Sequence, residues 1–571
     1  MTAETLAAGS PTADSPESSQ SPEPLESPAS GCLSGEAGDP GVRDALVRVL
    51  FGDDHRAAHG PWRALLTAEP FRRGPALAPD AQLELAYGRL RILNSTLDSA
   101  FRLAADPVAL ANMHEWLSPV DTALTTVAGI HYNLFLGTLI DHDGDVRRDL
   151  SDFADLTRTG TFLCTELDHG NDATALETTA DYDRARDGFL LRTPHAGAQK
   201  FMPNTSAAGG PKSGVVAARL LVDGQDLGVF LFLTALTGPR GPLPGVRVRL
   251  LPRRMGSVVD HCLTSFDGVF VPREALLSGP QGRLDAEGAF SSEVVNRRSR
   301  FLLSIGRVTA GKLSMSACAV GSVRAALAVA VRHGSHRLIG GVRPPERVPV
   351  MAHRSHYAPL AGALATAYAM TLLHRTVLRT WTECGGAEGS RTEGSRTERS
   401  GTEGSGAEGS GPEGSGAEGS GPERSGPEGS GAEGGGAQFR GGGRAGAERL
   451  VAVAKAWITW EARAVISECR ERCGAQGLLE NNGLAALVTG IEGAITAEGD
   501  NLAIHAKAAA GMVCDHHPPR PPAAPAGREL TDPVFLRELL AAVECVDLDR
   551  ARAGMREAAP GDALGRWNAG A

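Results

Sequence analysis

The sequence lacks the features that mark a nucleic-acid-binding, secreted or membrane-spanning protein. Its formal net charge is −10 at pH 7, whereas binding to a nucleic-acid backbone requires a clustered basic surface. No run of about 18 uncharged apolar residues is present, so no membrane span is expected. The first 40 residues show no basic segment followed by an apolar one, and the last residues show no Ser-Lys-Leu peroxisomal address. A cytoplasmic location is therefore expected.

The chain also lacks a strong metal-binding motif, so no metal is expected. Its nine cysteines include no Cys-x-x-Cys pair. Cys469 and Cys473 lie one helical turn apart, a spacing more typical of buried small residues than of ligands. The run from Cys514 to His517 is a better ligand set, but it opens a proline-rich tail and is interpreted as a solvated loop.

Three segments are too rich in glycine, serine, proline and glutamate to form a core. Residues 1–40 are expected to be a disordered tail, and residues 514–571 a proline-rich tail with a short helix. Residues 383–445 contain a five-residue repeat with no apolar residue beyond alanine. This low-complexity Gly/Ser/Glu insertion is expected to be a flexible acidic loop rather than a stacked solenoid, because it has nothing to bury.

The spacing of apolar residues predicts an α+β multidomain architecture. Residues 41–155 have the periodicity of helices and are expected to form an N-terminal helical domain. Residues 156–280 contain short β-type runs punctuated by Gly and Pro, which predict a compact central β-barrel or sandwich. Residues 295–382 and 446–513 return to helical patterns and are expected to form the two parts of a C-terminal helical bundle.

Five sequence blocks, in one order, connect this architecture to a known family. They are Cys164–Asn171 with Leu176–Ala180, Met255-Gly256 with Phe266–Glu274, Gly306-Arg307-Val308, Cys473–Gly477 and Ala497–Asn501. Together they resemble the flavin loop, the exit strand, the first bundle helix, the gly-gly-his-gly loop and the catalytic turn of the acyl-CoA oxidases. The resemblance covers roughly residues 90–510. It implies an FAD-dependent enzyme that introduces a trans-2 double bond into an acyl thioester, as in fatty-acid β-oxidation.

The resemblance assigns the general base to Glu498. An α-proton of a thioester is too weakly acidic for an unaided carboxylate, so the carbonyl must be polarised while the β-hydride passes to an acceptor. In the family the flavin is that acceptor, and a glutamate on the opposite side takes the proton. Gly499 would let the backbone approach the substrate thioester closely, because it has no Cβ.

Further residues match positions that contact flavin or substrate in the family. The resemblance implies that Thr165 faces the pyrimidine edge of the flavin and that Asn171 lies toward the acyl-thioester tunnel. It places Gly474 and Asp500 at the cofactor as well. Arg337 matches an arginine that pairs with the flavin pyrophosphate, and its alternative is a solvated arginine at a helix end.

Two departures from the family pattern stand out. Asn204 occupies the position beside flavin N5 where oxidases have glycine and dehydrogenases have threonine, so it could donate a hydrogen bond but would fill the space there. Ala475 and Gln476 replace the usual gly-his of the loop that lies along the cofactor pyrophosphate of a neighbouring subunit. Neither change removes the base.

Several alternatives remain open at this stage. The substrate could be an acyl-CoA or a carrier-protein thioester, and the electron acceptor could be oxygen or an electron-transfer flavoprotein, as for a dehydrogenase. A non-catalytic interaction protein on the same scaffold is a further alternative. Because family members carry flavin at a subunit interface, a homodimer or homotetramer is implied.

Overall fold

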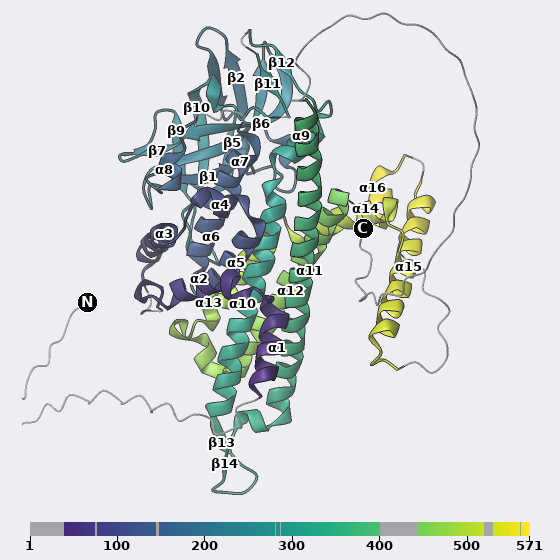
Figure 1. The fold of residues 1–571 in the computed structure, drawn as a ribbon. Coiled ribbons are helices and arrows are strands. Elements are labelled where there is room, and N and C mark those ends of the chain that lie inside the picture. The colour runs from purple at the N-terminus through teal and green to yellow at the C-terminus, as the bar shows by residue number, and fades with distance from the viewer. Residues whose placement is uncertain are drawn as a thin grey trace, which may run out of the picture.

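A computed structural model describes residues 39–72, 74, 77–143, 148–279, 281–285, 287–399, 443–518, 529–559 and 561–570. A helical domain is followed by a β domain and then by a bundle of long helices (Figure 1), which confirms the predicted α+β architecture. Nearly all of the expected N-terminal tail, most of the low-complexity insertion and residues 519–528 lie outside the described residues.

Short helices, several of them with an aspartate N-cap, make up the N-terminal domain. Asp106 and Asp121 begin two of them, and each carboxylate accepts hydrogen bonds from two backbone N–H groups of the first turn. The elements are α1 (Pro40–Phe51), α2 (His55–Thr67), η1 (Glu69–Phe71), α3 (Pro79–Ser95), α4 (Ala100–Ala105), α5 (Pro107–Leu117), α6 (Thr122–Ala128), the π-helical η2 (Gly129–Leu136), α7 (Gly137–His142) and α8 (Ser151–Ala154).

The β domain is built on one eight-stranded sheet. Six strands pair in the order β1-β5-β2-β3-β10-β4, while β6 pairs with β5 and β9 pairs with β10. The bounds are β1 (Thr159–Leu163), β2 (Thr179–Asp183), β3 (Gly188–Arg192), β4 (Lys200–Asn204), β5 (Lys212–Val222), β6 (Gln225–Ala235), β9 (Val246–Leu250) and β10 (His261–Pro272). Small two-stranded ladders join β7 (Thr237–Gly238) to β8 (Gly241–Pro242) and β11 (Arg283–Leu284) to β12 (Phe290–Ser291).

The prediction of a barrel requires a correction, because the sheet does not close. Between the described residues of β1 and β4 no ladder forms, and a single bridge from Glu166 to Lys200 spans the two edges. The chain leaves β1 after Leu163, and its bonds to the β4 edge are those around this bridge, where the Thr165 carbonyl accepts from Phe201 N–H and Leu167 N–H donates to the Gln199 carbonyl.

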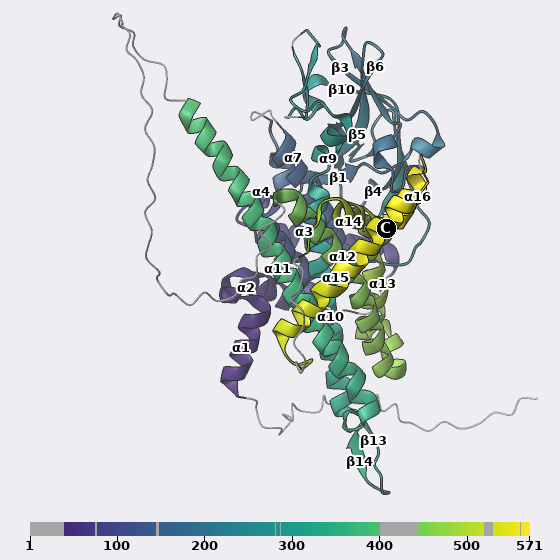
Figure 2. The same ribbon diagram turned by 90° about the vertical axis from the view of Figure 1, so that its right-hand side faces the viewer.

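Long helices form the C-terminal bundle and pack around α10. Helix α10 contacts α5, α11, α12 and α13, so it joins the N-terminal domain to the bundle (Figures 1 and 2). The elements are η5 (Arg273–Ala275), α9 (Arg297–Ser304), α10 (Arg307–His336), β13 (Leu338–Gly340), β14 (Arg347–Pro349), η6 (Val350–Ala352), α11 (Arg354–Arg399), α12 (Gly443–Arg472), η7 (Gly474–Leu478), η8 (Glu480–Asn482), α13 (Leu484–Thr496) and α14 (Asn501–Asp515). The short helices η3 (Ala173–Ala175) and η4 (Ala196–Ala198) lie in the β domain.

Two further helices, α15 (Pro533–Glu557) and α16 (Ala563–Gly570), follow the bundle and contact it through α14. Arg552 of α15 donates to the carbonyls of Val513 and His516 at 2.9 and 2.7 Å. The imidazole of His516 pairs with Glu544, so the His516 region is a contact between helices rather than the solvated loop expected from sequence.

Two helical stretches, Thr122–His142 and Arg307–His336, are long and apolar enough to cross a membrane by length and composition. However, 72% and 67% of their most apolar windows are buried inside the protein. They are the core helices of the N-terminal domain and of the bundle, which explains their apolar composition.

Candidate active site

The turn that contains Glu498 is held in an unusual backbone conformation. Helix α13 ends at Thr496 and α14 begins at Asn501, and Asp500 caps α14 by accepting from the N–H groups of Leu502 and Ala503. Between the helices, Glu498 has φ +61° and Gly499 has φ +104°. A left-handed glutamate is costly for an L-residue and indicates a position that the surrounding structure enforces.

The carboxyl group of Glu498 lies on the backbone of α10. A Cβ built on Gly311 would fall 2.3 Å from both Cδ and Oε1 of Glu498, so only glycine leaves room for the carboxyl there. Glu498 is half-buried. Burial raises the pKa of its carboxyl to about 7, while the positive charges of Lys312 and Lys455 act in the opposite direction.

The two lysines reach Glu498 from different helices. Lys312 follows Gly311 on α10, and Lys455 lies on α12. The Lys455 ammonium is fully buried and donates to the carbonyls of Ile495 and Gly499 at 2.8 and 3.0 Å. The turn is therefore connected to both α10 and α12, the two longest fully described helices beside it.

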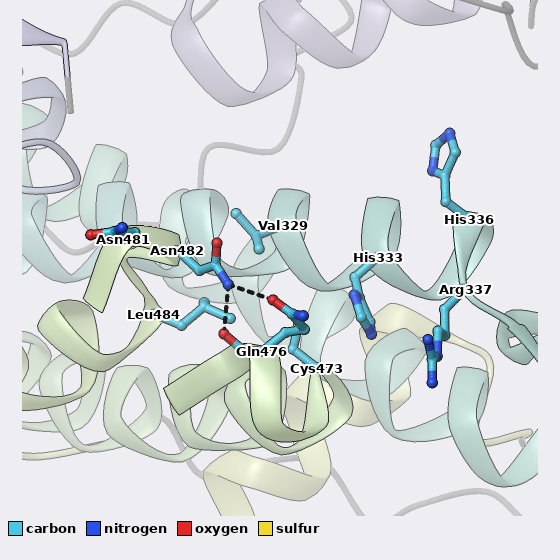
Figure 3. Close-up of a pocket in the computed structure, with 9 residues that line it drawn as sticks. All are labelled: Val329, His333, His336, Arg337, Cys473, Gln476, Asn481, Asn482 and Leu484. Carbon is cyan, nitrogen blue, oxygen red and sulfur yellow. Dashed lines mark hydrogen bonds between the residues drawn. The ribbon is translucent and has the colours of Figure 1, made fainter. Parts of the chain in front are cut away.

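A separate hollow lies where α10 meets the loop after α12. It has a volume of about 600 Å³, and its lining includes His333, Arg337 and Gln476 (Figure 3). Figure 3 shows His333 and Arg337 pointing to the same side of the end of α10, while the Asn482 amide donates to Gln476 at 2.8 and 3.0 Å. A neighbouring hollow of about 420 Å³ is lined by Arg337 and by the loop residues Gly474, Ala475 and Gln476. Predicted cofactor residues Arg337 and Gly474 are thus brought together.

Thr165 and Asn171 lie in the loop that follows β1, and both are exposed. The loop is fixed by the buried carboxylate of Glu166, which accepts from the N–H groups of Glu177 and Thr178 and pairs with Lys200 at 2.9 Å. Asn171 has φ +58°. The backbone next to Thr165 is therefore held in place, because the neighbouring Glu166 is bound both by two backbone N–H groups and by Lys200.

The Asn204 side chain is buried in the protein interior. Its amide oxygen accepts from Thr161 at 2.5 Å, and its amide nitrogen donates to the Tyr87 hydroxyl at 3.1 Å. That hydroxyl also accepts from Lys212, which pairs with Asp260 at 2.6 Å. The Asn204 side chain therefore uses its oxygen and one of its two amide N–H groups within the protein, so at most one N–H is left to donate to a cofactor.

The predicted residues thus fall into four places: the turn at Glu498, Gly499 and Asp500, the hollow at Arg337 and Gly474, the β1 loop at Thr165 and Asn171, and the buried network at Asn204. Gly311, Lys312 and Lys455 were missed at the sequence level. For the two lysines the signal was a charged residue within an otherwise apolar helical run, as in the segment Val451–Trp460 around Lys455. Only the folded structure shows that these runs face Glu498.

Comparison with known proteins supports the same family. Residues 444–513 match the model of the acyl-CoA oxidase C-alpha1 domain. Among curated proteins, human peroxisomal acyl-coenzyme A oxidase 3 is 26% identical over 443 residues, which cover 76% of this chain and 56% of the relative. Arabidopsis thaliana acyl-coenzyme A oxidase 2 is 28% identical over 278 residues, covering 47% of this chain and 40% of the relative. The chain therefore spans about half the length of the curated relatives it matches.

Solved structures show the same fold. Acyl-CoA oxidase 3 from Yarrowia lipolytica has a TM-score of 0.72 at 21% identity, over 93% of this chain and 75% of that chain. Glutaryl-CoA dehydrogenase from Mycobacterium smegmatis has a TM-score of 0.55 at 17% identity, over 82% of this chain and 96% of that chain.

The helical domain, open sheet and helical bundle, with a glutamate turn on the central bundle helix, define the acyl-CoA oxidase and dehydrogenase fold. The chain shares this fold, and in sequence it is similar to proteins named as acyl-CoA oxidases.

Proposed function

We propose that the chain is an FAD-dependent oxidoreductase of the acyl-CoA oxidase type, which introduces a trans-2 double bond into an acyl thioester. The observation that carries this proposal is the Glu498 carboxyl, which lies half-buried on Gly311 and has its pKa raised to about 7. A general base works best when its pKa lies near the operating pH, because it is then ionised and still basic enough to take a proton.

The backbone of the same turn supplies a second element. Within the described residues the N–H of Glu498 has no hydrogen-bond partner, so it is available to donate to a thioester carbonyl. Gly499 carries no side chain and would let the substrate thioester come close to this donor. One short turn would thus polarise the carbonyl and remove the α-proton, since both groups belong to Glu498.

The hollow around Arg337 fits the pyrophosphate of a dinucleotide. The Arg337 guanidinium is exposed beside His333, and the loop backbone at Gly474 has φ +58° with nothing within 4 Å of the place where a Cβ would stand. A fork of N–H donors and an uncovered loop backbone are suited to phosphate oxygens. Acyl-CoA oxidase structures from Caenorhabditis elegans are described with FAD. Bound FAD would accept the β-hydride of the substrate.

The other predicted contacts follow from this placement. Thr165 would meet the flavin ring, and Asn171 would face the acyl chain. The Asp500 Oδ1 atom caps α14, so only its second oxygen is left for the cofactor. Since the Arg337 hollow and the Glu498 turn are separate places, a second subunit would complete each site, as expected for a homodimer or homotetramer.

We also propose a cytoplasmic location, although the curated relatives include proteins named as peroxisomal.

An acyl-CoA dehydrogenase that passes electrons to an electron-transfer flavoprotein is the second candidate. It is favoured by Asn204, which stands where oxidases have glycine and is enclosed by Thr161 and Tyr87. A carrier-protein thioester instead of acyl-CoA would leave the chemistry of Glu498 unchanged.

A visible spectrum of the purified protein tests the proposal. We expect flavin absorption, and we expect it to bleach when acyl-CoAs of several chain lengths are added without oxygen. Protein that binds no flavin after reconstitution with FAD would favour the non-catalytic alternative. Protein that binds flavin but is bleached by no acyl-CoA would require the same experiment with acyl carrier-protein thioesters.

A further inference from the structure

Lysine is rare in this chain and is concentrated at buried ionic sites. Of the 57 lysine and arginine residues, only five are lysines: Lys200, Lys212, Lys312, Lys455 and Lys507. Lys200 and Lys212 are fully buried and pair with Glu166 and Asp260. Lys455 is also fully buried and Lys312 is half-buried, and both interact electrostatically with Glu498. Since arginine supplies nearly all other positive charges, these four positions have a specific use for a compact ammonium.

The contacts of Lys455 match those of an ammonium group. Its Nζ atom lies 2.8 Å from the Ile495 carbonyl, 3.0 Å from the Gly499 carbonyl and 2.8 Å from Oδ1 of Asn501. An ammonium has three N–H donors, one for each of these acceptors, whereas a neutral amine has two and would leave one buried oxygen unpaired. The charged form therefore fits the site, although burial lowers the pKa of Lys455 to about 7.

These three acceptors surround the base in the sequence. Ile495 precedes Glu498 at the end of α13, Gly499 follows it directly, and Asn501 opens α14. The Asn501 amide in turn donates to Thr459 and to the Ala456 carbonyl on α12. Helix α12 thus holds the turn through hydrogen bonds of Lys455, Ala456 and Thr459, while α10 contacts the carboxyl at Gly311.

We propose that Lys455 is a positioning residue for the base: its ammonium binds the carbonyls on both sides of Glu498 and holds the left-handed turn that sets the carboxyl against Gly311. All three N–H groups of Lys455 are used by these acceptors, so none is left to bind the carboxylate directly. Lys455 therefore places Glu498 and favours its ionised form by charge alone, while leaving the carboxylate oxygens free to take a proton. This role rests on the proposed function of Glu498 as the base.

Other charged groups near Glu498 would remain when Lys455 is replaced. Lys312 of α10 interacts electrostatically with the carboxyl, and its own pKa is affected by the charges of Lys507 on α14 and Glu448 on α12. Asp500 in the turn interacts with Lys455. Removing the Lys455 charge leaves Lys312 as the remaining cation near the carboxyl. We therefore expect the pKa of Glu498 to rise when Lys455 is neutralised. The positive charge of Lys312 should limit this rise.

Two variants separate charge from shape. Lys455→Met keeps the length of the side chain and removes the charge and the donors. Lys455→Arg keeps the charge but cannot direct three N–H groups from one nitrogen atom, so we expect it not to rescue the turn. Arg463→Met is the matched control, because Arg463 is a half-exposed cation on the same helix that pairs with Glu492 of α13 at 3.6 Å.

The first measurement is the rate of anaerobic flavin reduction by an acyl-CoA as a function of pH, in the FAD-loaded protein. For Lys455→Met we expect a rate at least about tenfold lower at pH 7 and a midpoint of the pH profile at least about one unit higher. Arg463→Met should match the native protein in both. If Lys455→Met keeps the native rate and midpoint, the positioning role is overturned while the proposed function stands.

The second measurement needs no activity and therefore remains informative if the native protein fails to bleach. The change in melting temperature caused by Glu498→Gln is recorded from pH 5 to pH 9, with and without Lys455→Met. This effect of Glu498→Gln depends on pH, and we expect its midpoint to lie at least about one pH unit higher when Lys455 is replaced. An unmoved midpoint would contradict the coupling of the two residues. If neither Lys455 variant folds, Lys455 is a structural element alone and the proposal is also overturned.

Discussion

The carboxyl group of Glu498 and the α-carbon of Gly311 are in direct contact, and no other residue type could occupy position 311 without moving that carboxyl. A Cβ at this position would stand 2.3 Å from the carboxyl carbon of Glu498. The contact joins the α13–α14 turn to the middle of the buried helix α10 and is the relationship on which the site depends.

Gly311→Ala should therefore reduce the rate of flavin reduction strongly while changing the stability of the fold only slightly. We expect anaerobic flavin reduction to fall by at least about tenfold, because the new methyl group displaces the carboxyl by an ångström or more. Alanine is favoured over glycine within a helix by about 1 kcal/mol, which offsets part of the cost of the clash. Gly362→Ala in α11 is the control, since nothing lies within 4 Å of its added Cβ. An unchanged reduction rate in Gly311→Ala would show that the carboxyl does not act from this position.

Glu498→Gln should retain flavin and fold but lose flavin reduction by at least about two orders of magnitude, the usual scale for loss of a general base. The amide keeps the shape of the side chain and removes the proton acceptor. Stopped-flow absorbance of the flavin measures this rate directly. Reduction at the native rate would mean that another group is the base.

The same substitution should change how stability depends on pH. The folded pKa of Glu498, about 7, lies above its ordinary value of 4.5, so its contribution to stability is full below pH 4.5 and is lost as the pH rises through 7. Glu498→Gln should therefore match the native protein near pH 4.5 and be more stable at pH 8. Chemical denaturation at the two pH values checks the sign, and a variant less stable at pH 8 would contradict the raised pKa.

Acid should destabilise the native protein at a pH well above the range in which ordinary carboxylates are protonated. Burial lowers the pKa of His59, His114 and His131 to about 4 and that of His374 to about 3. A buried histidine with a lowered pKa makes its full contribution to the free energy of unfolding above about pH 6.5. This contribution is lost as the pH falls toward 4, by about 1.4 kcal/mol per pH unit for each proton. Glu498 acts in the opposite direction over part of this range, but one carboxyl cannot offset four imidazoles. Urea denaturation should show falling stability from pH 6.5 to 4.5, and a flat profile would exclude this set of neutral histidines.

A further loss is expected at lower pH from Glu115. Its buried carboxylate pairs with Arg324 and Arg375, and despite burial these charges lower its pKa to about 2. The stabilisation is full above about pH 4.5 and is lost as the pH falls through 2. Glu115→Gln should be destabilised at neutral pH, because it leaves two arginines without their buried partner. Equal stability of Glu115→Gln and the native protein at pH 7 would contradict this.

Turnover in air should release hydrogen peroxide without an added electron acceptor if the enzyme is an oxidase. Asn204→Gly restores the residue that oxidases carry, and we expect it to raise peroxide release while leaving anaerobic reduction about the same. The variant should also lose about 1–3 kcal/mol of stability, since Thr161 and Tyr87 lose their buried partner. Peroxide is followed by a coupled dye assay. Reduced native flavin that persists in air for minutes would instead establish the dehydrogenase alternative.

Local patterns were sufficient for the elements and their order. The helical spacing in residues 41–155 and the short β-type runs such as Val229–Leu233 correspond to observed helices and to strand β6. Whether the sheet closes into a barrel was not decided by these patterns, because closure depends on whether two strand edges, β1 and β4, meet in register. The helical contact at His516 was missed for a similar reason, since its partner Glu544 lies 28 residues further along the chain.

The sequence by itself determined the family resemblance and predicted Glu498 as the candidate base, because the turn between two helices is a local feature marked by glycine and a capping aspartate. Only the tertiary structure decided what surrounds that glutamate. Gly311, Lys312 and Lys455 come from two other helices, and their approach depends on how α10 and α12 pack against the turn. The enclosure of Asn204 by Thr161 and Tyr87 likewise joins the β domain to the N-terminal helices. Burial and electrostatic interaction between distant segments set the chemistry of these groups, and neither is visible in the order of residues along the chain.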